Sequence, residues 1–269
     1  MSQPVLAGVP TGPVTVPGAI LALAGNGSIT PVWRNACGGL TFRIEGGAEI
    51  RYAKWVAAGT VGIDLSEEAE RLAWAQGRVP VPQVVEHGAD AEGAWLLTAA
   101  VPGRSAVDPR WMADPEAAAA GMGRGIRRLH DALPVDRCPV DWSVDRRLRL
   151  ADERIATGAG PAGWFPEHRH LTVAEARDRI GRPPPIDRLV VCHGDACAPN
   201  TLLYDDGSFA AHVDLGSLGL ADRWADLATA AWSTDWNYGR GYDGVVYDAY
   251  GIEPDPDRIA YYRLLWDMA

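Results

Sequence analysis

Three oxygen-bearing side chains stand close together in the C-terminal half of the chain. Asp195 follows a short apolar run, Asn200 comes five residues later, and Asp214 ends the next apolar run. The intervening Asp206-Gly207 dipeptide predicts a hairpin turn, because these residues tolerate the backbone angles that tight turns require. Antiparallel pairing about this turn would bring Asn200 beside Asp214, with Asp195 in the loop just before.

This combination of residue types is suited to phosphoryl transfer. Carboxylate and amide oxygens suit Mg²⁺, which keeps part of its water shell and is shared with substrate phosphates. Kinases have an acid in the catalytic loop, an asparagine a few residues later and an Asp-x-Gly on the next strand. The chain has His193-Gly194-Asp195, then Asn200, then Asp214-Leu215-Gly216. We predict Asp195 as the catalytic acid and Asn200 and Asp214 as metal ligands; a solvated turn is the alternative.

A single lysine stands among 24 arginines. Lys54 lies in a β-rich segment from Ile29 to Val56, on a run with partial alternation. A compact ammonium contacts phosphate oxygens as a point charge, which a planar guanidinium does not reproduce, although chance placement is the alternative. Gly38 and Gly39, in a turn of this segment, would let backbone N–H groups approach phosphates; a plain hairpin turn explains them equally well.

Composition limits the class of partner. A chain of 269 residues that is 47% hydrophobic can bury a core large enough for one large domain or two lobes. The net charge of −10 disfavours nucleic acid and anionic membranes as partners, because both bind basic surfaces. An acidic surface favours a cationic small molecule instead. We expect a monomer or a weak dimer.

The cysteines and the N-terminal segment indicate a cytoplasmic protein. The four cysteines form no Cys-x-x-Cys pair, so reduced thiols are expected. A zinc cluster at Cys192, His193 and Cys197 is disfavoured because no fourth ligand recurs at finger spacing. The apolar segment from Val14 to Gly25 has no basic residue before it and is interrupted by proline, so we predict neither a signal peptide nor a membrane span.

Three helices are expected from local signals. The first covers Ser66–Gln76 with its first residue as N-cap, because glutamates fill the first turns. The second covers Pro115–Leu133 and is stopped by the proline that follows; His130 on it is given a packing role only. The third covers Ala221–Trp232 and leads into an aromatic and polar loop that ends at Tyr242.

The motifs resemble those of the aminoglycoside phosphotransferases, bacterial antibiotic-resistance kinases with a protein-kinase-like fold. The resemblance rests on His193 to Asn200 and on Asp214 to Ala228, and it extends to Leu129 to Pro139 and Tyr261 to Leu265. It implies an α+β, two-lobed fold, with a small β-rich nucleotide-binding lobe (residues 1–101) and a larger, mostly helical catalytic lobe (102–269). It also implies ATP as phosphate donor.

The resemblance assigns further roles. Glu68 would pair with Lys54 in the kinase arrangement. The main chain at Ala99 and Val101 would bind adenine, although an ordinary strand end explains this stretch as well. Asp226 would be a buried acceptor that braces the catalytic loop.

The acceptor side departs from the family pattern. Ser217 stands where many members have arginine, and Trp266-Asp267 stands where two adjacent acids help to bind the antibiotic. Asp235-Trp236 replaces an acidic pair expected in 3'-kinases, which favours a streptomycin-like 3''-hydroxyl. We predict Asp267 and Asp235 as contacts to a cationic aminoglycoside. A kinase of another small alcohol and a catalytically dead nucleotide-binding module stay open.

Overall fold

The structure, a computed structural model, describes residues 7–47 and 49–269. The chain divides into two compact units, with the division after Val101. The N-terminal unit is rich in antiparallel strands and the C-terminal unit is mostly helical. The predicted fold class, α+β with a small β-rich part before a larger helical part, is confirmed. The first six residues of the predicted N-terminal lobe lie outside the described residues.

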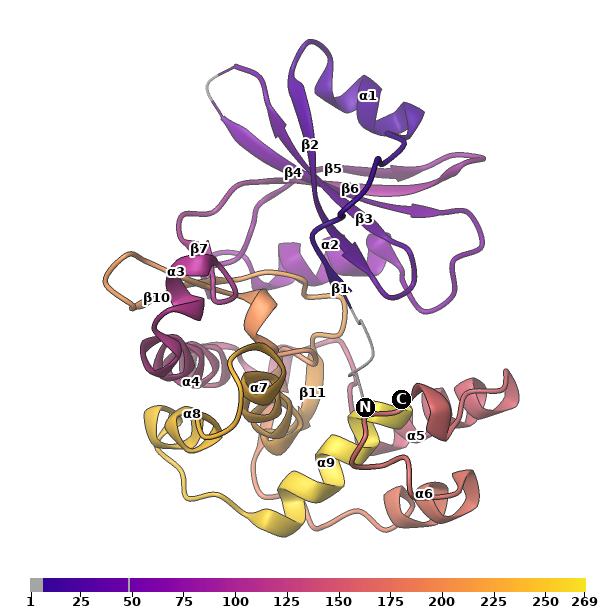
Figure 1. The fold of residues 1–269 in the computed structure, drawn as a ribbon, viewed down its shortest axis with the longest axis vertical. Helices are drawn as coiled ribbons and strands as arrows, with labels where there is room; N and C mark the ends of the chain where they lie inside the picture. The colour runs from indigo at the N-terminus through magenta and orange to yellow at the C-terminus, as the bar shows by residue number, and fades with distance from the viewer. Residues whose placement is uncertain (1–6, 48) are drawn as a thin grey trace. The chain divides into compact units, whose positions relative to one another are not determined.

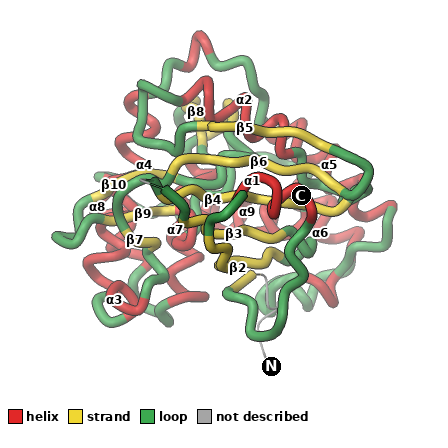
Figure 2. The backbone as a smooth tube through the Cα atoms, turned by 90° about the horizontal axis from the view of Figure 1, so that it is seen from above, coloured by secondary structure: helices red, strands yellow, loops and turns green. Residues whose placement is uncertain are grey.

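A six-stranded antiparallel sheet forms the N-terminal unit, with strand order β1-β2-β3-β4-β6-β5 (Figure 2). Its strands are β1 (Ala7–Gly8), β2 (Ser28–Asn35), β3 (Leu40–Glu45), β4 (Ile50–Ala57), β5 (Val84–Ala89) and β6 (Gly93–Ala99). Two helices accompany the sheet, α1 (Gly18–Ala24) and α2 (Leu65–Ala75). Alternate residues of β3, beginning with Leu40, are buried together with Ile20 of α1, so this face of the sheet carries one core cluster of the unit.

The N-cap of helix α2 lies two residues earlier than predicted. The N-cap is Asp64, not Ser66, because the Asp64 carboxylate accepts hydrogen bonds from the Ser66 N–H at 2.9 Å and the Glu67 N–H at 3.0 Å. Both residues are good caps, and only the path of the chain entering the helix decided between them.

The C-terminal unit consists of helices with short strands between them (Figure 1). Its helices are α3 (Pro109–Met112), α4 (Pro115–Ala132), α5 (Val144–Ala156), α6 (Val173–Ile180), α7 (Trp224–Asn237), α8 (Asp243–Tyr250) and α9 (Pro256–Met268). Its strands are β7 (Arg104–Ser105), β8 (Leu189–Cys192), β9 (Thr201–Leu203), β10 (Phe209–His212) and β11 (Gly219–Asp222). Single 3₁₀ turns cover Val135–Arg137, Pro161–Gly163 and Ala198–Asn200.

The predicted hairpin about Asp206-Gly207 is confirmed. Strands β9 and β10 pair antiparallel, and the N–H of Tyr204 donates to the Ser208 carbonyl at 2.9 Å to close the turn. Gly207 has φ of 79°, the left-handed conformation that the Asp-Gly signal anticipates. The N–H of Val213 then donates to the Asn200 carbonyl at 3.0 Å, which places Asn200 at the strand end beside Asp214.

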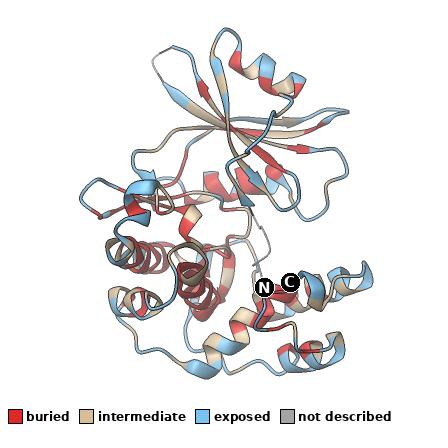
Figure 3. Cartoon of the chain, viewed as in Figure 1, coloured by how far each residue is buried: buried red, intermediate tan, exposed pale blue. Residues whose placement is uncertain are grey.

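The core of this unit lies among α4, α7 and α8, and Figure 3 shows the buried residues concentrated in α4 and α7. The predicted helix at Pro115–Leu133 is confirmed as α4. The helix predicted at Ala221–Trp232 is shifted: it starts at Trp224 and continues to Asn237. Strand β11 extends to Asp222, whose carboxylate accepts from the Trp224 N–H at 3.1 Å and fixes the turn into α7. In the described part of the chain, no helix is both long and apolar enough to span a bilayer.

Helix α4 contains glycines because its neighbours approach its backbone. A Cβ at Gly123 would lie 2.4 Å from the Val246 carbonyl oxygen of α8. Gly123→Ala should therefore destabilise the fold by about 1–3 kcal/mol through overpacking, although alanine is the better helix former. The control is Gly244→Ala in α8, where an added Cβ meets nothing within 4 Å; it should be neutral or stabilising by up to ~1 kcal/mol. Urea denaturation of both variants tests this, and equal stabilities would contradict the packing argument.

Candidate active site

Asp195 and Asn200 are joined at the entrance of the β9–β10 hairpin. The Asn200 side-chain amide donates to the Asp195 carbonyl at 2.9 Å and to Asp195 Oδ2 at 3.1 Å. Its amide nitrogen is thereby occupied, which leaves the Asn200 amide oxygen as the atom suited to a cation. Asp195 Oδ1 is buried and has no hydrogen-bond partner within the described residues. Burying a carboxylate oxygen without a hydrogen-bond partner costs folding free energy, unless a bound ligand supplies the missing contact.

Asp214 has an unusual backbone conformation. Its φ of 64° is the only positive φ of a non-glycine residue within residues 7–47 and 49–269. Such residues cost free energy and cluster at functional sites, where the surrounding structure holds them. The following residues pack tightly on the catalytic loop, since a Cβ at Gly194 would lie 2.1 Å from the Ser217 carbonyl oxygen. Gly194 also has φ of 86°, so glycine is required there for two separate reasons.

His193 links the catalytic loop to the strand that leads to Asp214. Its Nδ1 accepts from the Asp195 N–H at 3.3 Å, and its Nε2 lies 3.0 Å from the Val213 carbonyl oxygen. A neutral imidazole with its proton on Nε2 satisfies both bonds, because one nitrogen accepts and the other donates. His193 is therefore a positioning residue for both acids.

The two carboxylates interact electrostatically. Burial, followed by the neighbouring negative charge of Asp214, raises the pKa of Asp195 above its ordinary value. A divalent cation shared by these groups would remove the repulsion, so the donor set fits Mg²⁺. The structure thus brings the three predicted groups together. Their oxygen atoms and excess negative charge would be matched by a metal ion bound with phosphate.

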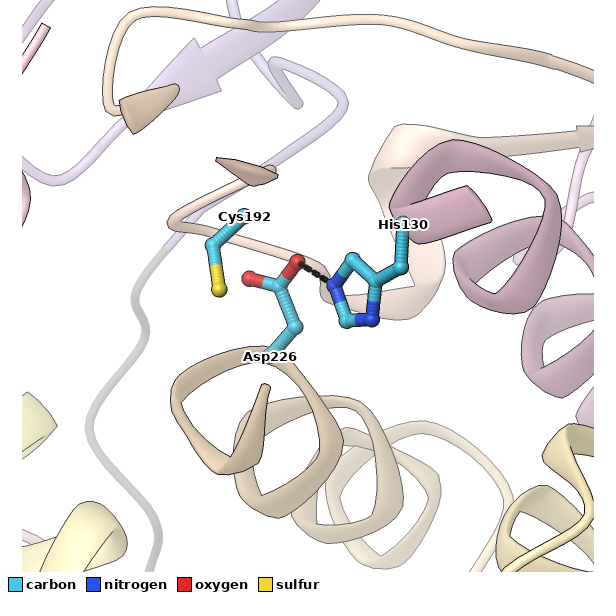
Figure 4. A group of neighbouring side chains, drawn as sticks. All are labelled: His130, Cys192 and Asp226. Atoms are coloured by element: carbon cyan, nitrogen blue, oxygen red, sulfur yellow. Dashed lines mark hydrogen bonds and ion pairs between the residues drawn. The ribbon is translucent and has the colours of Figure 1, made fainter. Parts of the chain in front are cut away.

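A buried carboxylate holds the catalytic loop from beneath. Asp226 of α7 accepts the His193 N–H at 2.6 Å on Oδ2 and the Gly194 N–H at 2.9 Å on Oδ1. His130 of α4 adds a third contact, with Nε2 3.0 Å from Asp226 Oδ2 (Figure 4). Burial by itself would raise the pKa of Asp226, but the hydrogen bonds and charges of its neighbours lower it, so the carboxylate is ionised. The predicted bracing contact is confirmed.

His130, Cys192 and Asp226 also resemble a metal cluster in their spacing (Figure 4). Both nitrogens of His130 are engaged, since Nδ1 lies 3.0 Å from the Tyr250 hydroxyl and Nε2 faces Asp226. Burial raises the pKa of the Cys192 thiol far above its usual range, so it is not the thiolate that metals require. His130 and Asp226 form a hydrogen-bond network that joins α4 and α7, whereas the Cys192 thiol donates to the Asp222 carbonyl at 3.4 Å. His130 has a larger structural role than the sequence indicated.

The N-terminal unit pairs Lys54 with Glu68. Lys54 Nζ of β4 donates to the two carboxylate oxygens of Glu68 of α2 at 2.7 and 2.9 Å. Glu68 is only 3% exposed, so its carboxylate makes this contact in a buried position. The predicted pairing is confirmed, whereas the role of the pair in nucleotide binding stays a prediction.

The other predicted nucleotide contacts lie in two parts of the same unit. Gly38 has φ of 84° in the β2–β3 turn, and the Gly39 N–H donates to the Asn35 side-chain oxygen at 2.7 Å. Ala99 is the last residue of β6, where its N–H donates to the Gln83 carbonyl at 2.9 Å, and Val101 lies beyond the strand. The Ala99 carbonyl and the Val101 N–H are the groups through which this segment could recognise a base.

The two acids predicted to contact the acceptor differ in their surroundings. Asp235 is half-buried on α7, and burial followed by the charge of Asp243 raises its pKa despite the opposing influence of Arg263. Asp267 is buried near the end of α9, where Oδ2 accepts from the Phe165 N–H at 2.8 Å and lies 2.7 Å from His168 Nδ1. Asp267 thus fixes a distant loop of its own chain, and contact of either acid with a substrate stays a prediction.

Helix α7 contributes contacts that the sequence did not indicate. Ser233 Oγ accepts from the Ala198 N–H at 2.8 Å, which fastens the helix to the catalytic loop. Trp232 and Trp236, one turn apart on α7, pack against Phe165 and against Trp266 of α9; Trp236 stacks on Phe165, whereas Trp232 meets the Trp266 ring edge-on. The spacing of the two tryptophans on α7 was the available signal. The prediction recognised the aromatic character of this stretch but ended the helix at Trp232, so the helical spacing was not used.

Asp226→Asn tests the brace beneath the loop. An amide has one acceptor oxygen, so one of the loop N–H groups would face the amide NH₂ and lose its partner. We expect a loss of about 3 kcal/mol of stability, the scale for a buried hydrogen bond to a charged group, together with reduced turnover. The control is Asp248→Asn, an exposed acid on α8, which should change stability by less than about 0.5 kcal/mol. Matching unfolding midpoints for the two variants would rule out the brace.

The sequence and structure match known proteins over most of the chain. The model of the phosphotransferase enzyme family matches residues 56–262. An aminoglycoside 3'-phosphotransferase of Streptomyces fradiae is 36% identical over 254 residues, which cover 85% of this chain and 90% of that protein. A streptomycin 3''-kinase of Streptomyces griseus is 37% identical over 227 residues, covering 79% and 82%.

Solved structures agree with these relatives. The aminoglycoside phosphotransferase APH(3'')-Id from Streptomyces rimosus, in complex with ADP and streptomycin, has a TM-score of 0.74 and 31% identity, covering 91% of this chain and 94% of that one. An aminoglycoside 3'-phosphotransferase of type VIII has a TM-score of 0.81 at the same identity, covering 93% and 97%. Together with the geometry of the catalytic loop, these matches establish that the chain belongs to the phosphotransferase enzyme family, as an enzyme of the aminoglycoside phosphotransferase type.

Proposed function

We propose that this enzyme transfers the γ-phosphoryl group of ATP to a hydroxyl of an aminoglycoside antibiotic and thereby inactivates it. The observation that carries the proposal is the meeting of Asp195, Asn200 and Asp214, with Asp195 Oδ1 buried and lacking a hydrogen-bond partner in the described chain. The relatives named above support the aminoglycoside as acceptor. A streptomycin-like 3''-hydroxyl is favoured over a 3'-hydroxyl.

The proposed reaction needs little covalent chemistry from the protein. The acceptor hydroxyl oxygen attacks the γ-phosphorus, the bond to the β,γ-bridging oxygen breaks, and ADP leaves. Asp195 Oδ1 orients the hydroxyl and takes its proton, which then passes to solvent. Asn200 and Asp214 would hold Mg²⁺, which when bound neutralises charge on the phosphates.

The N-terminal unit would hold the nucleotide. Lys54, fixed by Glu68, would contact phosphate oxygens as a point charge. The glycine turn at Gly38 and Gly39 would bring backbone N–H groups to the phosphates. The ADP complex of the Streptomyces rimosus relative supports an adenine nucleotide as donor. A cytoplasmic location, where ATP and reduced thiols are maintained, completes the proposal.

Asp195→Asn should separate turnover from stability. Loss of the proton acceptor should lower kcat by at least ~10² while nucleotide binding is kept. The raised pKa means that the folded state binds the Asp195 proton more tightly than the unfolded state, so ionised Asp195 destabilises the fold as pH rises above about 3.8. Asparagine removes this penalty. The variant should therefore melt at a higher temperature than the wild type at pH 7, by a margin that shrinks towards pH 4.

Steady-state assays and melting curves across this pH range test both parts. Near-normal kcat would remove Asp195 from the catalytic role. A lower melting temperature at pH 7 would show that the carboxylate is satisfied in the folded state.

Lys54→Arg tests the nucleotide site while the charge is kept. A guanidinium also pairs with the two oxygens of Glu68, but its charge is spread over a larger planar group, so it would not present a compact positive charge to the phosphate oxygens. We expect kcat/KM for ATP to fall about tenfold, roughly 1.4 kcal/mol. The control exchange is Arg78→Lys in the exposed turn that follows α2, which should leave kcat/KM unchanged. If Lys54→Arg and the wild type have equal kcat/KM for ATP, Lys54 has a structural role only.

A further inference from the structure

An aromatic cluster lies beside the catalytic loop within the C-terminal unit. It consists of Phe165, Trp232, Trp236 and Trp266, from the segment before α6, from α7 and from α9. Phe165 and Trp236 are stacked, with ring centroids 4.6 Å apart and planes 22° apart. Trp266 lies 5.3 Å from Trp236. Trp232 and Phe165 are buried, whereas Trp236 and Trp266 are partly exposed, so these two are the members of the cluster that reach the surface.

Two contacts locate the cluster relative to the reacting carboxylate. Ser233, between the two tryptophans of α7, accepts from the Ala198 N–H three residues after Asp195. The side chain of Trp266 is also among the neighbours that lower the pKa of Asp195 against the effect of burial. The partly exposed aromatic rings therefore stand next to the carboxylate that orients the acceptor hydroxyl.

The cluster is accompanied by carboxylates. Glu167 Oε2 accepts from the Trp232 indole N–H at 3.1 Å. Asp235 lies half-buried on α7, between Trp232 and Trp236. The negative charge of Glu167 is near enough to contribute to the raised pKa of Asp235. An aromatic face combined with carboxylates suits a planar cation better than a compact ammonium, because a guanidinium can stack through its face and donate through its edge.

The protein itself contains an example of this geometry. The guanidinium of Arg263 lies over the Trp232 ring, 5.6 Å from the ring centroid. Its charge also opposes the rise in the pKa of Asp235. One guanidinium therefore already interacts with both an aromatic ring and a carboxylate of this cluster. Partly exposed Trp236 and Trp266 can offer a second guanidinium the same environment.

We propose that Trp236 and Trp266 are specificity-determining residues that hold a guanidino group of the acceptor by stacking, with Glu167 and Asp235 as its acidic partners. This inference rests on the proposed function and narrows the acceptor to guanidino-bearing aminoglycosides. Asp267 acts as a positioning residue for the platform, because its bond to the Phe165 N–H fixes the ring on which Trp236 stacks. The tryptophans select the cation by its shape as well as its charge.

Kinetics of two Trp266 variants with two acceptors test the proposal. The acceptors are streptomycin, which carries guanidino groups, and neamine, whose cations are all amines. Trp266→Leu keeps the apolar volume but removes the π face, so the KM for streptomycin should rise about tenfold, with a much smaller change in the KM for ATP. Trp266→Phe keeps a π face and removes the indole N–H, so it should keep a streptomycin KM within about threefold of the wild type.

The outcomes separate this inference from the proposed function. Failure to phosphorylate either compound contradicts the proposed function itself. Phosphorylation of neamine with equal or better kcat/KM than streptomycin, or an unchanged streptomycin KM in Trp266→Leu, overturns the guanidino platform while the kinase assignment stands. A rise in the streptomycin KM in Trp266→Phe as large as in Trp266→Leu assigns the effect to the indole N–H and also overturns stacking.

A second measurement uses the intact wild-type protein, so it does not depend on the folding of a variant. Methylguanidinium and methylammonium are compared as competitive inhibitors against the phosphorylated acceptor, at equal ionic strength. Stronger inhibition by methylguanidinium, by about fivefold or more, supports stacking on the tryptophans. Equal inhibition by the two cations shows selection by charge alone and contradicts the proposal.

Discussion

The buried carboxylate of Asp226 is the interaction on which the catalytic loop depends. Its oxygens accept the N–H groups of His193 and Gly194, and His130 approaches the same group from another helix. A buried charge is tolerated when every lone pair has a donor, and such a network then rigidifies its surroundings. The position of Asp195 is therefore set by α4 and α7, although Asp195 itself lies in a loop.

The site keeps conformations and charges that the fold alone would not favour. Asp214 is held at a positive φ, the Asp195 and Asp214 carboxylates repel, and Asp195 Oδ1 lacks a partner among the described residues. Each of these costs stability. A cation and a hydroxyl bound here would offset the repulsion and give Asp195 Oδ1 a partner. The close approach of Gly194 to Ser217 holds the segment that carries Asp195 against the segment that follows Asp214.

The aromatic cluster shows how two departures from the family pattern form one feature. Trp236 and Trp266 are 30 residues apart in sequence, yet their rings lie 5.3 Å apart on neighbouring helices. Asp267 adds to this by binding the backbone of Phe165, whose ring stacks on Trp236. Substitutions that seemed to weaken the resemblance therefore belong to a single aromatic surface close to the catalytic carboxylate.

The local features and the grouping of the candidate site residues could be predicted from the sequence. The Asp206-Gly207 turn, the helix at Pro115–Leu133 and the meeting of Asn200 with Asp214 follow from short-range turn chemistry and strand pairing, which act between neighbours in the chain. Resemblance to known kinases added the pairing of Lys54 with Glu68 and the brace at Asp226. Long-range packing settles which of two adequate caps starts α2, how far α7 extends, that His130 completes the Asp226 network, and that Asp267 is buried. These outcomes depend on contacts between segments far apart in sequence, and local propensity does not specify which distant surfaces will meet.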